Sequence, residues 1–142
     1  EVVRRETQSV GAGVNFSPDG KWLVVRESDE VNFVRVSDWK KQFTLQRDQP
    51  GFANVVISPD MKLLAMSEMT YVKLYDFPSR KLLALVRGPN DVRLSSSHPT
   101  AAGMCFSPDS KMLAIGTYQD IIQLWDLGLL RERLEQLGLD WN

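Results

Sequence analysis

The sequence predicts an all-β protein that consists of repeated β-sheets and ends in a short α-helix. Three Ser-Pro-Asp tripeptides carry this prediction, and they lie 41 and then 49 residues apart. They begin at Ser17, Ser58 and Ser107. Each is followed, 16 to 19 residues beyond its aspartate, by an alternating segment that closes on a second aspartate. These second aspartates are Asp38, Asp76 and Asp126. A period in this range, carried by short alternating strands, is typical of propeller-type repeats.

Each repeat opens with a short strand that leads into its Ser-Pro-Asp turn. The three strands are Val14-Asn15-Phe16, Val55-Val56-Ile57 and Met104-Cys105-Phe106. In the turn, proline presets φ at the first central position, and the serine and aspartate hydrogen-bond to nearby backbone. Gly20 supplies a position with positive φ in the first turn, whereas Met61 and Ser110 take that place in the others. We expect the second and third turns either to tolerate strain or to adopt a slightly different type.

Up to three further strands complete each repeat, and all are too short and too closely bounded for helices. The second strands follow the turns, at residues 21–25, 62–66 and 111–115. The third strands end on the second aspartates, at residues 34–38, 72–76 and 122–126. Their alternation places these side chains toward the core: Val34 and Val36, Val72 and Leu74, and Ile122 and Leu124. Fourth strands follow in the first two repeats, at residues 42–45 and 81–86. Four short strands in a repeat of about 40 residues correspond to one propeller blade.

The repeats resemble those of the bacterial WD40-repeat family, and the resemblance covers residues 1 to about 127. Trp125-Asp126 preserves the dipeptide that names the family, whereas Ser37-Asp38 and Tyr75-Asp76 are degenerate versions of it. The resemblance implies a β-propeller built from four-stranded blades, of which this chain holds three, and therefore a partial propeller. It also implies a rigid, non-enzymatic scaffold that binds other proteins or peptides.

The resemblance further implies buried hydrogen bonds among a His, a Ser or Thr, an Asp and a Trp of each blade. His98 stands about where the family's Gly-His dipeptide would fall before the third Ser-Pro-Asp. In the family an aspartate stands six residues before the third-strand position that Trp125 occupies here. At the three equivalent positions this chain has other residues. They are Val31, Met69 and Gln119. We expect this network to be partial at best, and apolar packing to hold the first two blades together.

The two ends of the chain predict different elements. Counting back from the first turn, Val2-Val3-Arg4 falls where a fourth strand without its own blade would lie. This strand either completes the last blade, as in closed WD40 rings, or belongs to a preceding blade. After Asp126 the pattern becomes helical, and Gly138 is a suitable stop signal. The apolar face of the helix consists of Leu130, Leu134 and Leu137. We expect it to cover the edge or underside of the propeller, with Trp141 as an added anchor.

These elements divide the chain into a propeller segment, residues 1–127, and a helix with its tail, residues 128–142. An extra strand is expected at residues 1–6, and blades at about 11–46, 52–86 and 101–127. Propellers have about four to eight blades, so three cannot close a ring, and open terminal blades expose apolar faces. We expect the C-terminal part of a larger propeller, or a chain that assembles with other chains and self-associates in isolation. The chain is expected to begin inside a longer, cytoplasmic protein, since it lacks a starting Met and a signal-peptide pattern.

The composition gives little support to chemistry within this segment. The net charge is −1, and there is one His and one Cys, which excludes a disulfide framework and a Cys metal cluster. His98 lies beside three serines in an irregular loop, where catalytic geometry is rarely held. Cys105 is expected to be a buried, inert thiol. Each Ser-Pro-Asp turn offers one carboxylate followed by a lysine, so we interpret its aspartate as turn-stabilising rather than a calcium ligand. No enzyme activity, cofactor, metal, nucleic acid or membrane partner is expected.

The predicted function therefore depends on loops. Connections from a fourth strand to the next first strand, and from a second to a third strand, gather on one face of a blade array, where binding residues concentrate. The candidate partner-binding residues are Phe52, Met69, Arg93, His98, Tyr118 and Gln119. The long connection at residues 87–100 is expected to be an exposed excursion without buried contacts, so deletion of residues 90–97 should barely change stability.

A second function stays open beside the scaffold. The residues after the helix, Leu137-Gly138-Leu139-Asp140-Trp141, are similar to the tails of large bacterial WD40 proteins. Many of those proteins carry an N-terminal serine/threonine kinase. The alternative is therefore a regulatory or sensing propeller segment of such a kinase.

Overall fold

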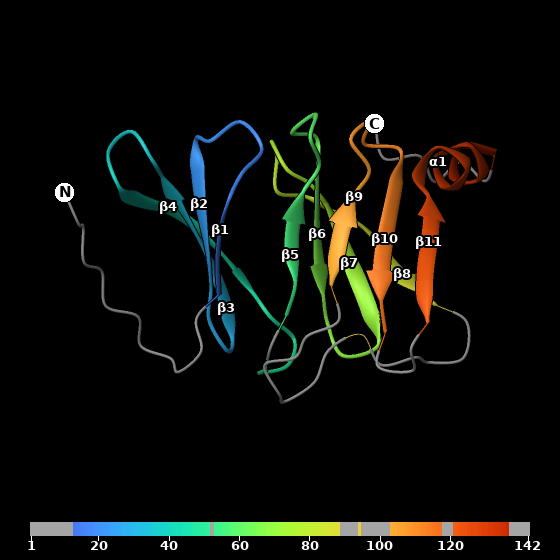
Figure 1. Cartoon of the computed structure of the whole chain (residues 1–142), viewed down its shortest axis with the longest axis horizontal. Coiled ribbons are helices and arrows are strands. Elements are labelled where there is room, and N and C mark those ends of the chain that lie inside the picture. Colours follow the sequence, from blue (N-terminus) through green and yellow to red (C-terminus); the bar gives the residue numbers. More distant parts are fainter. Residues whose placement is uncertain (1–12, 52, 89–93, 95–102, 118–120, 137–142) are drawn as a thin grey trace.

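The computed structural model describes residues 13–51, 53–88, 94, 103–117 and 121–136, which form three antiparallel sheets and one helix (Figure 1). Sheet A contains β1 (Gly13–Phe16), β2 (Trp22–Arg26), β3 (Glu30–Arg35) and β4 (Lys40–Gln46). Sheet B contains β5 (Val55–Ile57), β6 (Leu63–Ser67), β7 (Tyr71–Asp76) and β8 (Leu82–Arg87). Sheet C contains β9 (Met104–Phe106), β10 (Met112–Gly116) and β11 (Ile122–Asp126), and α1 (Leu127–Gln136) follows at once. The all-β prediction is confirmed, and so is the change from strand to helix after β11.

The three sheets repeat one strand register, and this register corrects the alignment of the first repeat. The equivalent pairs between second and third strands are Trp22–Arg35, Leu63–Asp76 and Met112–Asp126. The residue equivalent to Asp76 and Asp126 is therefore Arg35, and the expectation that the strand ends on Asp38 is wrong. Asp38 lies in the β3–β4 turn, where its Oδ1 accepts the backbone N–H of Lys40 at 3.1 Å. Aspartate is favoured in turns for this reason. Because the prediction relied on the residue type alone, it placed the end of the strand three residues too late.

The three Ser-Pro-Asp turns have the same hydrogen bonds. In each, the serine hydroxyl donates to the aspartate Oδ1 at 2.6 Å, and that Oδ1 also accepts the N–H of the following lysine at 3.1 Å. Gly20, Met61 and Ser110 have φ of 70°, 62° and 62°. The second and third turns therefore keep the type of the first and tolerate a left-handed residue, at a cost of about 1–2 kcal/mol each. The interpretation of the aspartates as turn-stabilising is confirmed.

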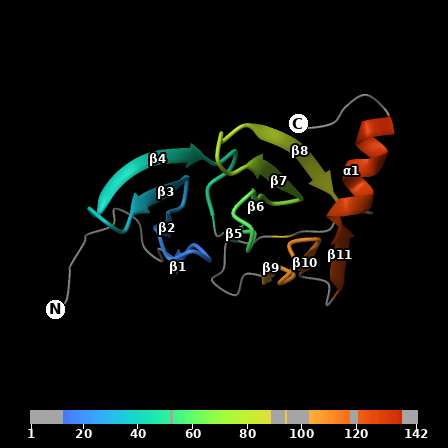
Figure 2. The same ribbon diagram turned by 90° about the horizontal axis from the view of Figure 1, so that it is seen from above.

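The sheets stack face to face, and Figure 2 shows β1, β5 and β9 on one side of the stack and β4 and β8 on the other. We call the face that a sheet turns toward the next sheet its forward face, and the opposite face its rear face. Successive residues of β6 lie on opposite faces of sheet B. Leu64 and Met66 pack toward sheet A, and Ala65 packs toward sheet C. This alternation follows from the pleat of a strand, and it gives the molecule two separate apolar cores.

The first core, which we call the A–B core, lies between sheets A and B. Its buried members are Val24, Val31, Phe33, Val55, Ile57, Leu64, Met66, Tyr75 and Phe77. The second, the B–C core, lies between sheets B and C. Its buried members are Ala65, Val72, Leu74, Val86, Leu94, Met104, Leu113, Ile115 and Leu127.

The inward orientation predicted for the third strands is confirmed in sheet B and wrong in sheet C. Val72 and Leu74 are fully buried, whereas Ile122 and Leu124 are 73% and 67% exposed. Within the described residues no sheet covers the forward face of sheet C. In the first repeat Val34 is buried, but Val36 lies in the turn after β3 and is only half-buried.

Helix α1 continues from β11 and closes the end of the B–C core. The Oδ1 of Asp126 accepts the backbone N–H of Leu129 at 2.9 Å, which caps the first turn of the helix. Leu127 is buried in the core, and Leu130 packs against it partly buried. Leu137, Gly138 and Trp141, and the predicted strand at residues 1–6, lie outside the described residues, as does the side chain of Leu134.

Candidate interaction surface

The connections between strands divide between two edges of the stack (Figure 1). The Ser-Pro-Asp turns lie along the upper edge, together with the β3–β4 turn and α1. The β2–β3, β4–β5 and β6–β7 connections lie along the lower edge. We call the described residues of this lower edge the loop edge: residues 27–29, 47–51 and 68–70. The expectation that these two kinds of connection share one face is confirmed for the described residues.

A buried ionic cluster holds the loop edge together across sheets A and B. Arg47 follows β4, and its Nη2 lies 3.4 Å from Oε2 of Glu68, which follows β6; both side chains are 1% exposed. The Nζ of Lys73 on β7 lies 3.3 Å from Oε1 of Glu68 and 2.6 Å from Oδ1 of Asp48. The hydroxyl of Tyr71 donates to Asp48 as well. Two cations thus face two anions, and each charge in the cluster has an opposite partner.

Arg47 also fixes the backbone of the loop edge. Its Nη1 donates to the carbonyl of Ser28 at 2.9 Å and to the carbonyl of Gly51. A second arginine, Arg26 at the end of β2, donates from Nη1 to the carbonyl of Ala53 at 3.0 Å. Sheets A and B are therefore joined by charged side chains as well as by an apolar core. The ionic cluster adds to the apolar packing expected for these two repeats, and its members Arg47 and Glu68 come from connections rather than from the repeat motif.

The cluster shifts the pKa values of three of its groups. Burial alone would lower the pKa of Lys73, but the hydrogen bond to Asp48 and the influence of Tyr75 and Glu68 outweigh it and raise that pKa. The hydrogen bond from Lys73, and then that from Tyr71, lowers the pKa of Asp48. The pKa of Tyr71 is raised, first by its hydrogen bond to Asp48. Each shift favours the protonation state that the hydrogen bonds need.

Of the candidate partner-binding residues, only Met69 belongs to the described part of the chain. It lies at the tip of the β6–β7 connection, directly after Glu68, and is 36% exposed. Its side chain thus projects from a turn whose neighbouring residue is buried in the ionic cluster. The other candidates lie outside the described residues. They are Phe52, Arg93, His98, Tyr118 and Gln119.

The long connection between β8 and β9 includes one described residue that corrects its prediction. Leu94 is 2% exposed and belongs to the B–C core, and its backbone N–H donates to the carbonyl of Met69 at 2.8 Å. The expectation of an excursion without buried contacts is therefore wrong at this position. Val92 and Leu94 are the only apolar residues between Asn90 and Ser97, and two alternating residues inside loop-type sequence are too short a pattern to predict burial.

Of the residues considered for chemistry, His98 lies outside the described residues. Cys105 is exposed on β9, which contradicts the expected burial, because it lies on the uncovered forward face of sheet C. Across the described ranges, no group of three or more His, Cys, Asp or Glu side chains could hold a metal ion. In the same ranges no helix is long and apolar enough to cross a membrane. A comparison with models of known protein families gave no match.

Proposed function

We propose that this chain is a segment of a WD40-type β-propeller and serves as a non-enzymatic scaffold for other proteins or peptides, which bind at the loop edge. The observation that carries the proposal is the threefold repetition of one unit. Two of its features recur without change in every repeat: the hydrogen-bonded Ser-Pro-Asp turn and the register of the strands that follow it. Face-to-face stacking of such units is the construction principle of propellers.

The loop edge supports the choice of the binding face. Its backbone is held by Arg47, Glu68 and Lys73, which are buried, while Asp48 and Met69 beside them are accessible. A binding surface gains affinity when its residues are already ordered before the partner arrives. Met69, which is 36% exposed, offers an apolar contact to an extended peptide, and the half-exposed carboxylate of Asp48 on the same edge offers a polar one.

A displayed random-peptide library, selected on the immobilised full chain, tests the proposal. We expect enriched peptides whose binding weakens at least about fivefold when Met69→Asp is introduced, since a central contact contributes more than about 1 kcal/mol. The matched control is Leu82→Asp, an exposed residue at the end of β8 that lies away from the loop edge, paired with Tyr75. Both variants should keep the melting temperature of the wild type. The proposal fails if no peptide is enriched, or if both variants bind the selected peptides equally.

A further inference from the structure

Three equivalent faces differ in one respect, which is whether another sheet covers them. Strand register aligns Val24, Ala65 and Ala114 on the forward faces of sheets A, B and C, opposite Phe33, Leu74 and Leu124. In sheets A and B these positions are fully buried by the next sheet. In sheet C, Leu124 is 67% exposed, and its neighbour Ile122, equivalent to the buried Val31 and Val72, is 73% exposed.

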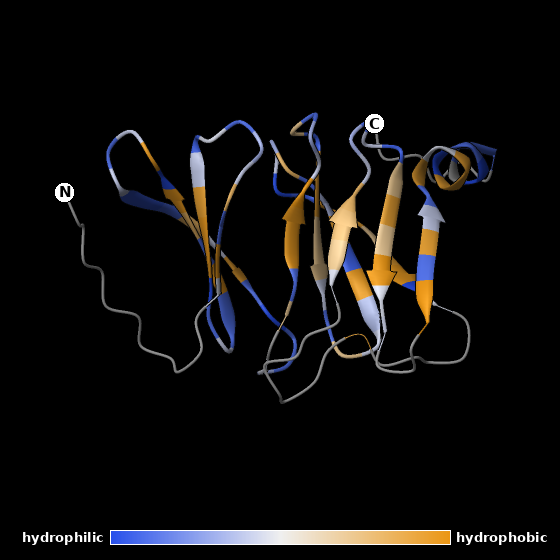
Figure 3. Ribbon diagram, in the orientation of Figure 1, coloured by the Kyte–Doolittle hydropathy of each residue, from blue (hydrophilic) through white to orange (hydrophobic). Residues whose placement is uncertain are grey.

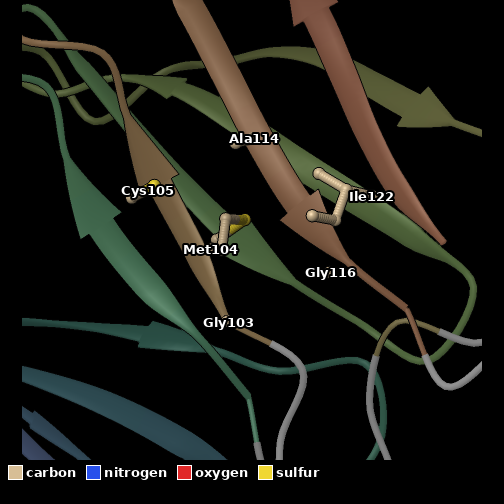
Figure 4. A pocket seen from close by; sticks show the side chains of 6 residues that line it. All are labelled: Gly103, Met104, Cys105, Ala114, Gly116 and Ile122. Carbon is tan, nitrogen blue, oxygen red and sulfur yellow. The ribbon is translucent and has the colours of Figure 1, made fainter. Parts of the chain in front are cut away.

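The exposed face of sheet C is continuous and apolar. Hydrophobic and hydrophilic residues alternate along β11 (Figure 3), and Ile122 and Leu124, which pair with Gly116 and Ala114, lie on this face. Beside them a shallow hollow of about 390 Å³ is lined by glycine and small or apolar side chains (Figure 4). The lining residues are Gly103, Met104, Cys105, Ala114, Gly116 and Ile122. Soluble proteins seldom leave such a face in water unless something binds there.

The opposite end of the stack exposes part of the complementary face. On the rear face of sheet A, Val14 and Phe16 of β1 are 61% and 58% exposed. Their equivalents in sheet B, Val55 and Ile57, are 2% and 6% exposed because sheet A covers them. The chain therefore has an uncovered forward face at one end and a partly uncovered rear face at the other. Forward against rear is the contact that it already makes twice internally.

We propose that the forward face of sheet C binds the rear face of sheet A in a second copy of this chain. The contact continues the packing of A on B and of B on C, with Leu124 entering the core position of Phe33 and Leu74. The same contact made twice closes two chains into a ring of six sheets, within the range of about four to eight blades that propellers have. Closed dimers of this kind have twofold symmetry. The inference rests on the proposal that the chain is a propeller segment.

The full 142-residue chain tests the contact by sedimentation over a wide concentration range. We expect a dimer for the wild type, and at least about tenfold weaker association for Leu124→Lys and for Phe16→Glu. Both positions are exposed, so each variant should retain the circular dichroism spectrum and melting profile of the monomer. Leu85→Lys, on the exposed part of β8, is the matched control and should dimerise normally. An equimolar mixture of Leu124→Lys and Phe16→Glu should dimerise, because one contact is then intact and the other pairs opposite charges.

The single cysteine gives a second readout that needs no substitution. Cys105 lies on the forward face of sheet C, in register with Ala114, and is exposed in one chain. Its labelling by a thiol reagent should slow at least about tenfold as the chain is concentrated into the dimer. The same protection should be absent in Leu124→Lys.

Three results would overturn the inference. A monomer at all concentrations, with Cys105 labelled at a constant rate, would mean that the face awaits another partner, such as a further blade of a longer polypeptide. A dimer disrupted by Leu124→Lys but not by Phe16→Glu would mean that two sheet C faces meet each other. A ladder of larger species would mean that two copies do not close. None of these results bears on the peptide-binding test of the loop edge, so the two proposals fail separately.

Discussion

The A–B and B–C interfaces share one strand register but have different chemistry. The strand register makes Gly88, Thr117 and Gln123 of the second interface equivalent to Arg47, Glu68 and Lys73 of the first. The first interface contains a buried ionic cluster. In the second, Gly88 lies so close to the side chain of Gln123 that an added Cβ would clash with it.

The apolar parts of the two interfaces differ in the same way. In the A–B core Phe33 stacks on Phe43 with ring centroids 4.3 Å apart, and Trp22 and Phe77 meet edge to face. The B–C core is mainly aliphatic and is completed by α1 and by Leu94 from the long connection. A repeated backbone therefore permits each interface its own side chains. The register determines where sheets meet, and the side chains determine how strongly and at which pH they stay together.

Two tryptophans allow the interfaces to be followed separately, because Trp22 packs on the A–B core and Trp125 on the B–C core. Variants in which the other tryptophans are replaced by phenylalanine would report one interface each during guanidinium unfolding.

The largest effect is expected from the aromatic centre of the A–B core. Phe33→Ala should lower the free energy of unfolding by about 3–5 kcal/mol, because it removes a fully buried ring and leaves a cavity. Leu113→Ala, equally buried in the B–C core, should cost less within the range of about 2–5 kcal/mol, since no ring stacking is lost. Equal losses, or a larger one for Leu113→Ala, would show that the aromatic core is not the stronger of the two.

Breaking the ionic cluster should have the next largest effect. Glu68→Ala leaves the buried guanidinium of Arg47 without its carboxylate and should cost about 3 kcal/mol. Glu68→Gln keeps an acceptor and should cost less. The matched change at the equivalent position of the B–C interface is Thr117→Ala, which should cost about 1 kcal/mol. A Glu68→Ala variant as stable as wild type would mean that the cluster contributes nothing to the A–B interface.

The contribution of the long connection to the B–C core is tested by one leucine. Leu94→Ala should lower the free energy of unfolding by about 2–3 kcal/mol and shift the Trp125-reported transition, because the side chain is 2% exposed. Leu85→Ala, which changes a half-exposed leucine on β8, should stay within about 0.5 kcal/mol of wild type. A comparably small effect of Leu94→Ala would contradict its place in the core.

The smallest effect is expected from pH. The pKa of Asp48 is lowered in the folded state, so its stabilisation is present above its ordinary value of 3.8 and is lost as the pH falls through the lowered pKa. The pKa values of Lys73 and Tyr71 are raised, so their stabilisation is present below 10.5 and 10.0 and is lost as the pH rises through the raised values. Asp48 is half-exposed, and solvent screening keeps its part small.

Unfolding midpoints between pH 2 and 7, followed by Trp22 and compared with Lys73→Met, would measure the acid limb. In that variant the pKa of Asp48 should return toward its ordinary value, so the part of the acid loss of stability that Asp48 contributes should become smaller. Identical acid profiles for the two proteins would exclude Lys73 as the partner that matters.

The sequence predicted the local structure because local structure depends on short-range chemistry. Each Ser-Pro-Asp turn closes its own hydrogen bonds within a few residues, and this held even where Met61 and Ser110 replace glycine. The strand alternation and the helix start after Asp126 have the same origin, since both depend on neighbouring residues. The exception was Asp38, whose residue type fits a turn as well as a strand end.

Only the tertiary structure decided which faces are covered and which charges meet. Arg47 and Lys73 are 26 residues apart and belong to different sheets, so no periodic pattern links them to Glu68. Ile122 and Leu124 have the same alternating pattern as Val72 and Leu74, yet they are exposed because burial depends on the neighbouring sheet. A residue's position along its strand determines the face of the sheet on which its side chain lies. Whether that face is buried depends on what packs against it, and only the arrangement of distant segments in space determines that.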